Sequence, residues 1–257
     1  MSTLPPEILD LIADHLHDEP ITLKTCCIVS KSWVPRARKH LFARVEFYAS
    51  ESHMERWKKT FPDPSNSPAH HTRELFIYGA LAITAADAGV SGRIRTFHNV
   101  VHLKLANLDR VSLVPFHALS PVVRSLHLTY FTPDVFDLVC SFPLLEDLAL
   151  HILYPEGQTA EWNPPSSSPK LTGSLRLGIY GRAHPVIRRL LDLPYGLHFS
   201  KINVMFYDKE TESVADLVSR CSDTLESLDI VNSPSSTLPS VPVTGQHLTA
   251  ACERRHT

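Results

Sequence analysis

Histidine is the residue type that most invites a chemical role in this sequence, because 15 of the 257 residues are histidines. Imidazole binds transition metals and exchanges protons near neutral pH. The most suggestive set is His102, His127 and His151, which occupy shifted positions in three successive predicted strands. They would share one face of a sheet but run diagonally, about 8 Å apart at Cβ. That separation is wide for a shared ion, so we expect neither a metal site nor a cofactor there.

Other catalytic signatures are missing from the sequence. It contains no Gly-x-Ser-x-Gly elbow, no phosphate-binding glycine loop and no His-Glu-x-x-His helix. His15 and His17 fall on different faces of a predicted helix, and His70 and His71 adjoin a proline-rich loop. The five cysteines are odd in number and lack Cys-x-x-Cys spacing, which favours neither disulfides nor zinc. We therefore predict that the protein is not an enzyme; a hydrolase or metal-dependent activity on the histidine row is the enzyme-class alternative.

The amino-acid composition indicates which classes of partner are not expected. The chain has 25 basic and 27 acidic residues, a formal charge of −2, and 43% hydrophobic residues, which is typical of globular proteins. The sequence lacks the overall basic excess of a protein that binds nucleic acid or an anionic membrane, so neither partner is expected. No signal peptide or transmembrane segment is predicted, and the location expected is cytoplasmic or nuclear. A local basic cluster lacks interleaved aromatic residues and is interpreted as a solvated helix face: Lys31, Arg36, Arg38, Lys39 and Arg44.

The first forty residues predict three short amphipathic helices. Pro5 and Pro6 suit the first turn of the first helix, which Pro20 ends. Thr22 is expected to cap the second helix and Ser30 the third. Pro35 requires that the third helix either begins there or bends. The predicted apolar positions of the three helices are Ile8, Leu9, Leu11, Ile12, Leu16; Leu23, Cys26, Cys27; and Trp33, Ala37, Leu41.

Residues 1–45 resemble the F-box motif, in the form abundant in mushroom-forming fungi. The resemblance rests on the Leu4-Pro5 start, the helical stripe, the Val29-Ser30-Lys31-Ser32-Trp33 step and the run 33–42. It implies docking onto the Skp-type adaptor of a cullin-RING ubiquitin ligase, without catalysis by the F-box itself. Some of the implied contacts must instead hold the helices together, and the alternative is that the stripe is only the core of a small helical cap. The implied adaptor contacts are Leu4, Pro5, Ile8, Leu9, Ile12, Leu16, Leu23, Val29, Ser30, Lys31 and Trp33.

The rest of the chain is an internal repeat. Pairs of the Leu-x-Leu type, in which isoleucine or valine replaces leucine in three of the seven, begin at 75, 103, 126, 148, 175, 202 and 228, at intervals of 28, 23, 22, 27, 27 and 26 residues. These intervals fall within the range of leucine-rich repeats, in which each repeat contributes a strand and a returning helix. Helical spacing between strands is clearest over 135–142, 187–191 and 214–221. Residues 73–232 thus resemble the irregular leucine-rich-repeat solenoids that follow many F-boxes.

These patterns predict an α/β protein: an F-box over 1–45, a connecting segment over 46–72, a solenoid over 73–232 and a disordered Ser/Pro/Thr-rich tail over 233–257. The proline-rich stretch 62–68 is expected to be a loop and 164–169 an insertion. Solenoids of this kind commonly bind on their concave strand surface; the alternative is that the strand-face residues are ordinary surface residues and that loops or other sequence do the binding. Positions expected to face outward there are Phe76, Tyr78, His102, Lys104, His127, Thr129, His151, Arg176, Asn203 and Met205.

The resulting functional hypothesis is a substrate-recognition adaptor of an SCF-type cullin-RING ubiquitin ligase. The F-box would dock on a Skp-type adaptor, and the solenoid would bind a protein substrate that the sequence does not identify. The alternative is a repeat scaffold that binds proteins without engaging the ligase, including a truncated member of the family.

Overall fold

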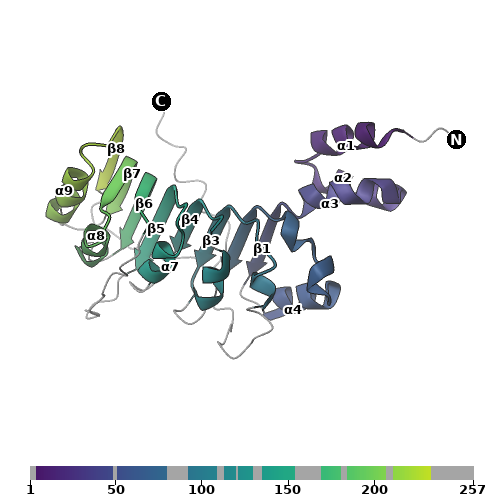
Figure 1. Ribbon diagram of the computed structural model, residues 1–257, viewed down its shortest axis with the longest axis horizontal. Helices are drawn as coiled ribbons and strands as arrows, with labels where there is room; N and C mark the ends of the chain where they lie inside the picture. The colour runs from purple at the N-terminus through teal and green to yellow at the C-terminus, as the bar shows by residue number, and fades with distance from the viewer. Residues whose placement is uncertain are drawn as a thin grey trace.

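Short runs in which apolar and polar residues alternate form the eight strands of one parallel sheet (Figure 1). The computed structural model describes residues 4–48, 51–79, 92–108, 113–119, 121–129, 135–153, 169–180, 184–206 and 211–232. Neighbours in the sheet are neighbours in sequence, which gives the order β1 to β8. The strands are β1 (Arg44–Tyr48), β2 (Glu74–Tyr78), β3 (His102–Ala106), β4 (Ser125–Thr129), β5 (Asp147–Leu153), β6 (Leu171–Tyr180), β7 (Leu197–Phe206) and β8 (Ser227–Asn232).

The predicted α/β class is confirmed, and the seven Leu-x-Leu pairs lie in β2 to β8. Their first residues are register partners from strand to strand: Leu75, Leu103, Leu126, Leu148, Leu175, Ile202 and Leu228. The first six are almost completely buried, whereas Leu228 in the last strand is 43% exposed. Burial of a shared leucine row between stacked repeats is what a solenoid-like fold requires.

Helices cover the buried face of the sheet, as their spacing predicted. They are α7 (Phe136–Cys140), α8 (His184–Leu191) and α9 (Thr211–Arg220), with the 3-10 helix η4 (Val114–Leu119) in the segment after β3. Their apolar positions join the leucine rows in one continuous core, in which Val135, Ile187 and Leu217 are fully buried. Figure 1 shows these helices together on one side of the sheet.

The sheet begins earlier than the repeat pattern indicated, because β1 extends into the segment expected to connect the two parts. Val45 and Phe47 point into the core, and the alternating residues of β1 pair with β2. The same segment contains α4 (Glu51–Thr60), whose Trp57 lies against Phe42, Phe47 and Phe97 at ring-centroid distances between 5.5 and 5.9 Å. This aromatic cluster closes the N-terminal end of the core.

The expected loop at 62–68 consists largely of two short 3-10 turns, η2 (Pro64–Asn66) and η3 (Pro68–His71). The side chains of Asp63 and Ser67 cap them by accepting hydrogen bonds from the backbone of Ser65 and Ala69. Residues 164–168 of the expected insertion and the tail 233–257 lie outside the described residues. Within the described part of the chain, none of the helices has the length and apolar character needed to cross a membrane.

Strand β6 contains a bulge at Gly173. The register with β7 shifts between Gly173 and Ser174, and Gly173 adopts a left-handed backbone with φ +78°. A Cβ at this position would lie 2.1 Å from the backbone oxygen of Glu146, which accepts a hydrogen bond from the Ser174 amide at 2.8 Å. Glycine is therefore required both by the backbone conformation and by the close approach of a neighbouring chain segment.

Three short helices precede the sheet and lie beyond β1 (Figure 1). They are α1 (Pro6–His15), α2 (Pro20–Val29) and α3 (Val34–Leu41), and the 3-10 turn η1 (Lys31–Trp33) leads into α3. Pro35 lies in the first turn of α3, so the helix begins at this point and does not bend there. Ser30 caps η1, whereas α2 begins at Pro20, two residues before the expected cap Thr22.

This three-helix unit has a core of its own, separate from the core beneath the sheet. Ala13, Leu23 and Ala37 are fully buried in it, one from each helix. Leu16, Cys27, Trp33 and Leu41 pack around them. A core this small gives little stability alone, and units of about 40 residues usually need a partner, a metal or disulfides.

Candidate functional site

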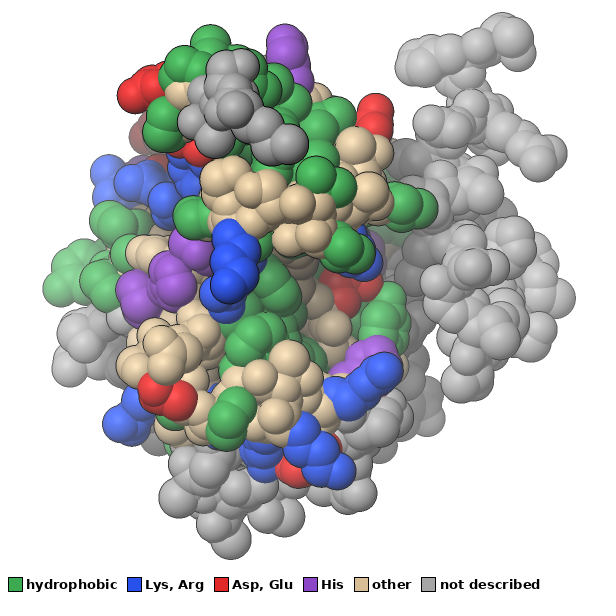
Figure 2. Space-filling model, turned by 90° about the vertical axis from the view of Figure 1, so that its right-hand side faces the viewer, with side chains coloured by type: hydrophobic (Ala, Val, Ile, Leu, Met, Phe, Trp, Pro, Cys, Tyr) green, Lys and Arg blue, Asp and Glu red, His purple; other side chains and the backbone are tan. Residues whose placement is uncertain are grey.

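The three-helix unit exposes an unusual number of large aliphatic side chains. On and just before α1, these are Leu4, Ile8, Leu11 and Ile12; on α2, they are Ile21, Ile28 and Val29. Their exposed fractions range from 37% for Ile12 to 85% for Ile28. Figure 2 views this end of the molecule and shows hydrophobic side chains over its upper part. Exposed apolar surface of this kind is typical of sites at which a protein interacts with another protein, a membrane or a ligand.

The structure divides the eleven predicted adaptor contacts into three sets by exposure. Six are exposed: Leu4, Pro5, Ile8, Ile12, Val29 and Lys31. Leu9, Leu16, Ser30 and Trp33 are partly buried, and Leu16 and Trp33 pack on the small core. Leu23 is completely buried at the centre of that core, so it is one of the residues that hold the three helices together and is not exposed to a partner. Leu11, Ile21 and Ile28 are also exposed and apolar, but they were not among the adaptor contacts implied by the F-box resemblance.

A charged cluster ties α1 to α3. Asp14 accepts hydrogen bonds from Arg36 Nε at 2.6 Å and from a second guanidinium nitrogen, Nη2, and it pairs with His40 Nε2 at 2.7 Å. The hydrogen bonds from Arg36, and secondarily from His40, hold the pKa of the Asp14 carboxyl well below its usual range. The bidentate arrangement fixes the relative position of the two helices.

We expect Asp14→Asn to loosen the three-helix unit without affecting the sheet, because Arg36 and His40 lose their shared anion while the main core is untouched. Amide hydrogen exchange should accelerate several-fold in α1 and α3 and stay unchanged in β3 to β6. Asp10→Asn is the matched control, since Asp10 is an exposed carboxylate one turn earlier on the same helix. Equal exchange in the two variants would contradict this role of Asp14.

The uncovered face of the sheet presents three rows of side chains that cross the strands in register. The middle row is Glu46, Phe76, Lys104, His127, Ala149, Arg176, Asn203 and Asp229, from β1 to β8. The first row, two residues earlier, is Arg44, Glu74, His102, Ser125, Asp147, Ser174, Lys201 and Ser227. The third row, two residues later, includes Tyr48, Tyr78, Thr129, His151 and Met205.

Aromatic and basic side chains stack at the β1–β3 end of this face. The rings of Tyr48 and Tyr78 are stacked, with centroids 5.2 Å apart. Arg44 lies 4.4 Å above the Phe76 ring, and Lys104 Nζ lies 5.9 Å from the rings of both Phe76 and Tyr78. Cations over aromatic faces are weakly attracted to them.

Glu46 is already engaged at this end. It accepts hydrogen bonds from Arg44 Nε at 2.8 Å and from the Tyr48 hydroxyl at 2.6 Å. The hydrogen bond to Glu46 is the main cause that raises the pKa of Tyr48 to about 12. The carboxylate of Glu46 is therefore already bonded to side chains of its own strand.

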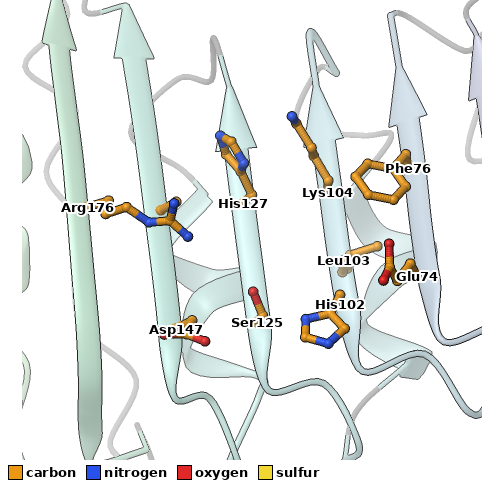
Figure 3. Close-up of a pocket in the computed structure, with 10 residues that line it drawn as sticks. Glu74, Phe76, His102, Leu103, Lys104, Ser125, His127, Asp147 and Arg176 are labelled. Carbon is orange, nitrogen blue, oxygen red and sulfur yellow. The ribbon is translucent and has the colours of Figure 1, made fainter. Parts of the chain in front are cut away.

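An open groove of about 220 Å³ crosses the strands from β2 to β6. All of its lining residues except the buried Leu103 come from the first and middle rows, and Figure 3 shows the Arg176 side chain extended toward His127. The middle-row edge, here called the basic rim, is Lys104, His127 and Arg176. The first-row edge, here called the acidic rim, is Glu74, His102, Ser125 and Asp147. Phe76, Leu103 and Ala149 complete the lining.

His127 and His151 lie side by side, with ring centroids 5.0 Å apart. Gly178 of β6 makes room for the second ring, because a Cβ there would lie 2.5 Å from His151 Nδ1. Burial, and then the charges of Lys104, His151 and Arg176, lower the pKa of His127 to about 3. The predicted diagonal of His102, His127 and His151 is present, one residue in each row. No set of three or more metal-ligating side chains suited to an ion occurs among the residues that the structure describes.

The structure brings five of the ten predicted strand-face residues together around the groove: Phe76, His102, Lys104, His127 and Arg176. Tyr78, Thr129, His151 and Met205 lie in the third row, and Asn203 donates a hydrogen bond to Asp229 at 2.7 Å. The groove residues that the sequence reasoning missed are Glu74, Ser125, Asp147 and Ala149. The same alternation that selected Phe76 and His127 points to them, since they share its period of two.

The fold and these two surfaces define an α/β protein with one sequential parallel sheet and a small helical unit at its N-terminal end. No protein-family model matches the chain, and no curated protein matches it.

Proposed function

We propose that this protein is the substrate-recognition subunit of an SCF-type cullin-RING ubiquitin ligase. In this proposal the three-helix unit is an F-box that docks on a Skp-type adaptor through its exposed aliphatic side chains. The irregular leucine-rich-repeat-like sheet then holds a protein substrate near the ubiquitin-charged enzyme. The subunit forms no bond itself and acts by raising the effective concentration of the substrate.

The observation that carries the proposal is the exposure of α1 and α2. Ile21, Ile28 and Val29 are between 75% and 85% exposed. They belong to a helical unit whose own core has only three fully buried residues. Burying such side chains contributes about 1.5–3 kcal/mol each. A partner that covers this surface would supply stability that the small core lacks.

Separation of the two surfaces also supports an adaptor role. The exposed apolar side chains lie on the helices beyond β1, whereas the groove spans β2 to β6. The small core and the main core share no buried residue. Two partners can therefore be bound at once, one on the helices and one on the sheet.

Co-purification of the full chain with a Skp-type adaptor tests the proposal. We expect a stoichiometric complex with the wild-type protein and its loss with Ile8→Asp, because an unpaired charge in an apolar interface is costly. The apparent affinity should fall by at least about tenfold. Val114→Asp is the matched control, since Val114 is also an exposed aliphatic residue but lies on η4, beneath the sheet.

Two results would overturn the proposal. One is the absence of a complex with wild-type protein whose circular dichroism shows it to be folded; the protein-binding scaffold without ligase engagement would then replace it. The other is an Ile8→Asp variant that binds the adaptor as well as Val114→Asp does.

A further inference from the structure

The groove across β2 to β6 has two edges of opposite character. Lys104 and Arg176 stand on the basic rim, and neither forms an ion pair with an acidic residue that the structure describes. Glu74 and Asp147 stand on the acidic rim, where Asp147 accepts a hydrogen bond from the Ser174 hydroxyl. The groove between them is open to solvent, so a ligand reaches both rims.

The positive charges of the basic rim lower the pKa values of neighbouring basic side chains. Lys104 is half-buried, and burial, together with the charges of Arg44 and Arg176, lowers its pKa against the opposing effect of the Glu46 carboxylate. The charges of Lys104 and Arg176 likewise lower the pKa of His151, after burial. The carboxylate nearest to Lys104 on this face is that of Glu46, which is already bonded to Arg44 and Tyr48. Lys104 and Arg176 therefore remain available to an anionic ligand.

The dimensions of the groove fit an extended chain. Lys104 in β3 and Arg176 in β6 are three strand spacings apart, or about 14 Å. An extended peptide covers that distance with about four residues. Its side chains alternate between two sides, so residues i, i+2 and i+4 would all face the same rim.

We propose that this groove binds an extended acidic segment of the protein substrate, with acidic side chains at alternate positions facing Lys104 and Arg176. The intervening side chains face Glu74 and Asp147 and are neutral or basic. That the ligand belongs to a protein substrate rests on the proposed function; the charge pattern of the ligand rests on the two rims alone. The whole chain carries a formal charge of −2, so the attraction is local to the groove.

Binding of fluorescein-labelled eight-residue peptides to the full-length protein, followed by fluorescence anisotropy, tests the assignment. The probe alternates glutamate with serine, and its matched control has the same eight residues with the four glutamates in one block. We expect the alternating peptide to bind at least about threefold more tightly, because the block places half of its glutamates against the acidic rim. Added salt should weaken the binding.

Substitutions locate the site. Arg176→Glu should weaken binding of the alternating peptide by about tenfold or more, and Lys104→Met should weaken it in the same direction. Lys201→Glu is the matched control with the same charge change, since Lys201 is exposed in the first row of β7, outside the groove. It should bind within about twofold of wild type.

Equal affinity for the alternating and block peptides would overturn the assignment, as would absence of binding or an Arg176→Glu variant that binds like wild type. Urea unfolding monitored by circular dichroism verifies that the sheet of each groove variant is folded. Adaptor co-purification separates the two proposals: Ile8→Asp should lose the adaptor but keep the peptide, whereas Arg176→Glu should do the reverse.

Discussion

Replacing Gly173 with alanine is expected to lower the free energy of unfolding by about 2–5 kcal/mol. The left-handed backbone at this position costs an alanine about 1–2 kcal/mol. The added Cβ would overlap the backbone oxygen of Glu146, to which it would lie 2.1 Å away, and such overpacking costs about 1–3 kcal/mol more. Because the obstacle is backbone, a change of side-chain rotamer does not relieve it.

Urea unfolding monitored by circular dichroism measures this effect. Gly92→Ala is the control, since a Cβ at Gly92 meets nothing within 4 Å. We expect the control to unfold within about 1 kcal/mol of wild type. If the two variants had the same midpoint, the bulge of β6 would not constrain the sheet.

His127 should make the sheet sensitive to acid. The pKa of His127 is lowered to about 3 by burial and by Lys104, His151 and Arg176, against about 6.5 in an unfolded chain. Below pH 6.5 the unfolded state therefore binds a proton that the folded state does not. Stability from this residue is fully present above pH 6.5 and is lost as the pH falls toward 3.

Between pH 6.5 and 4.5, His127 should account for a loss of about 1–2 kcal/mol, a value reduced from the full shift because the groove is open to water. His127→Gln should remove that part of the loss, which unfolding midpoints at the two pH values will show. His98→Gln replaces an exposed histidine and should lose as much stability as wild type. An identical acid loss in both variants would rule out His127 as the cause.

The repeating strands were predictable because their signal is redundant. Seven Leu-x-Leu pairs at similar intervals predicted β2 to β8, and their leucines lie in register. Strand β1 was missed because Val45 and Phe47 do not form such a pair and lie next to the helical motif. Helix α4 was missed because most of its residues are polar, and Trp57 anchors it through ring contacts distant in sequence.

The surfaces were predictable only in part. Alternation placed Phe76, Lys104 and Arg176 on the open face, but it could not show that the Arg176 side chain extends across the sheet toward His127. In the helical unit, the stripe pattern is the same for residues that face inward and outward. Leu23 and Ile28 have the same chemical character, and only the packing of three helices buries one and exposes the other.

The sequential order of the strands has a consequence for how the chain acquires its structure. Each strand of the sheet pairs only with those next to it in sequence, so every pairing closes a segment of comparable length. The entropy lost in such closure rises only slowly with segment length. Folding can then begin at any adjacent pair and extend in either direction, including during synthesis, when earlier repeats are available before later ones have been made.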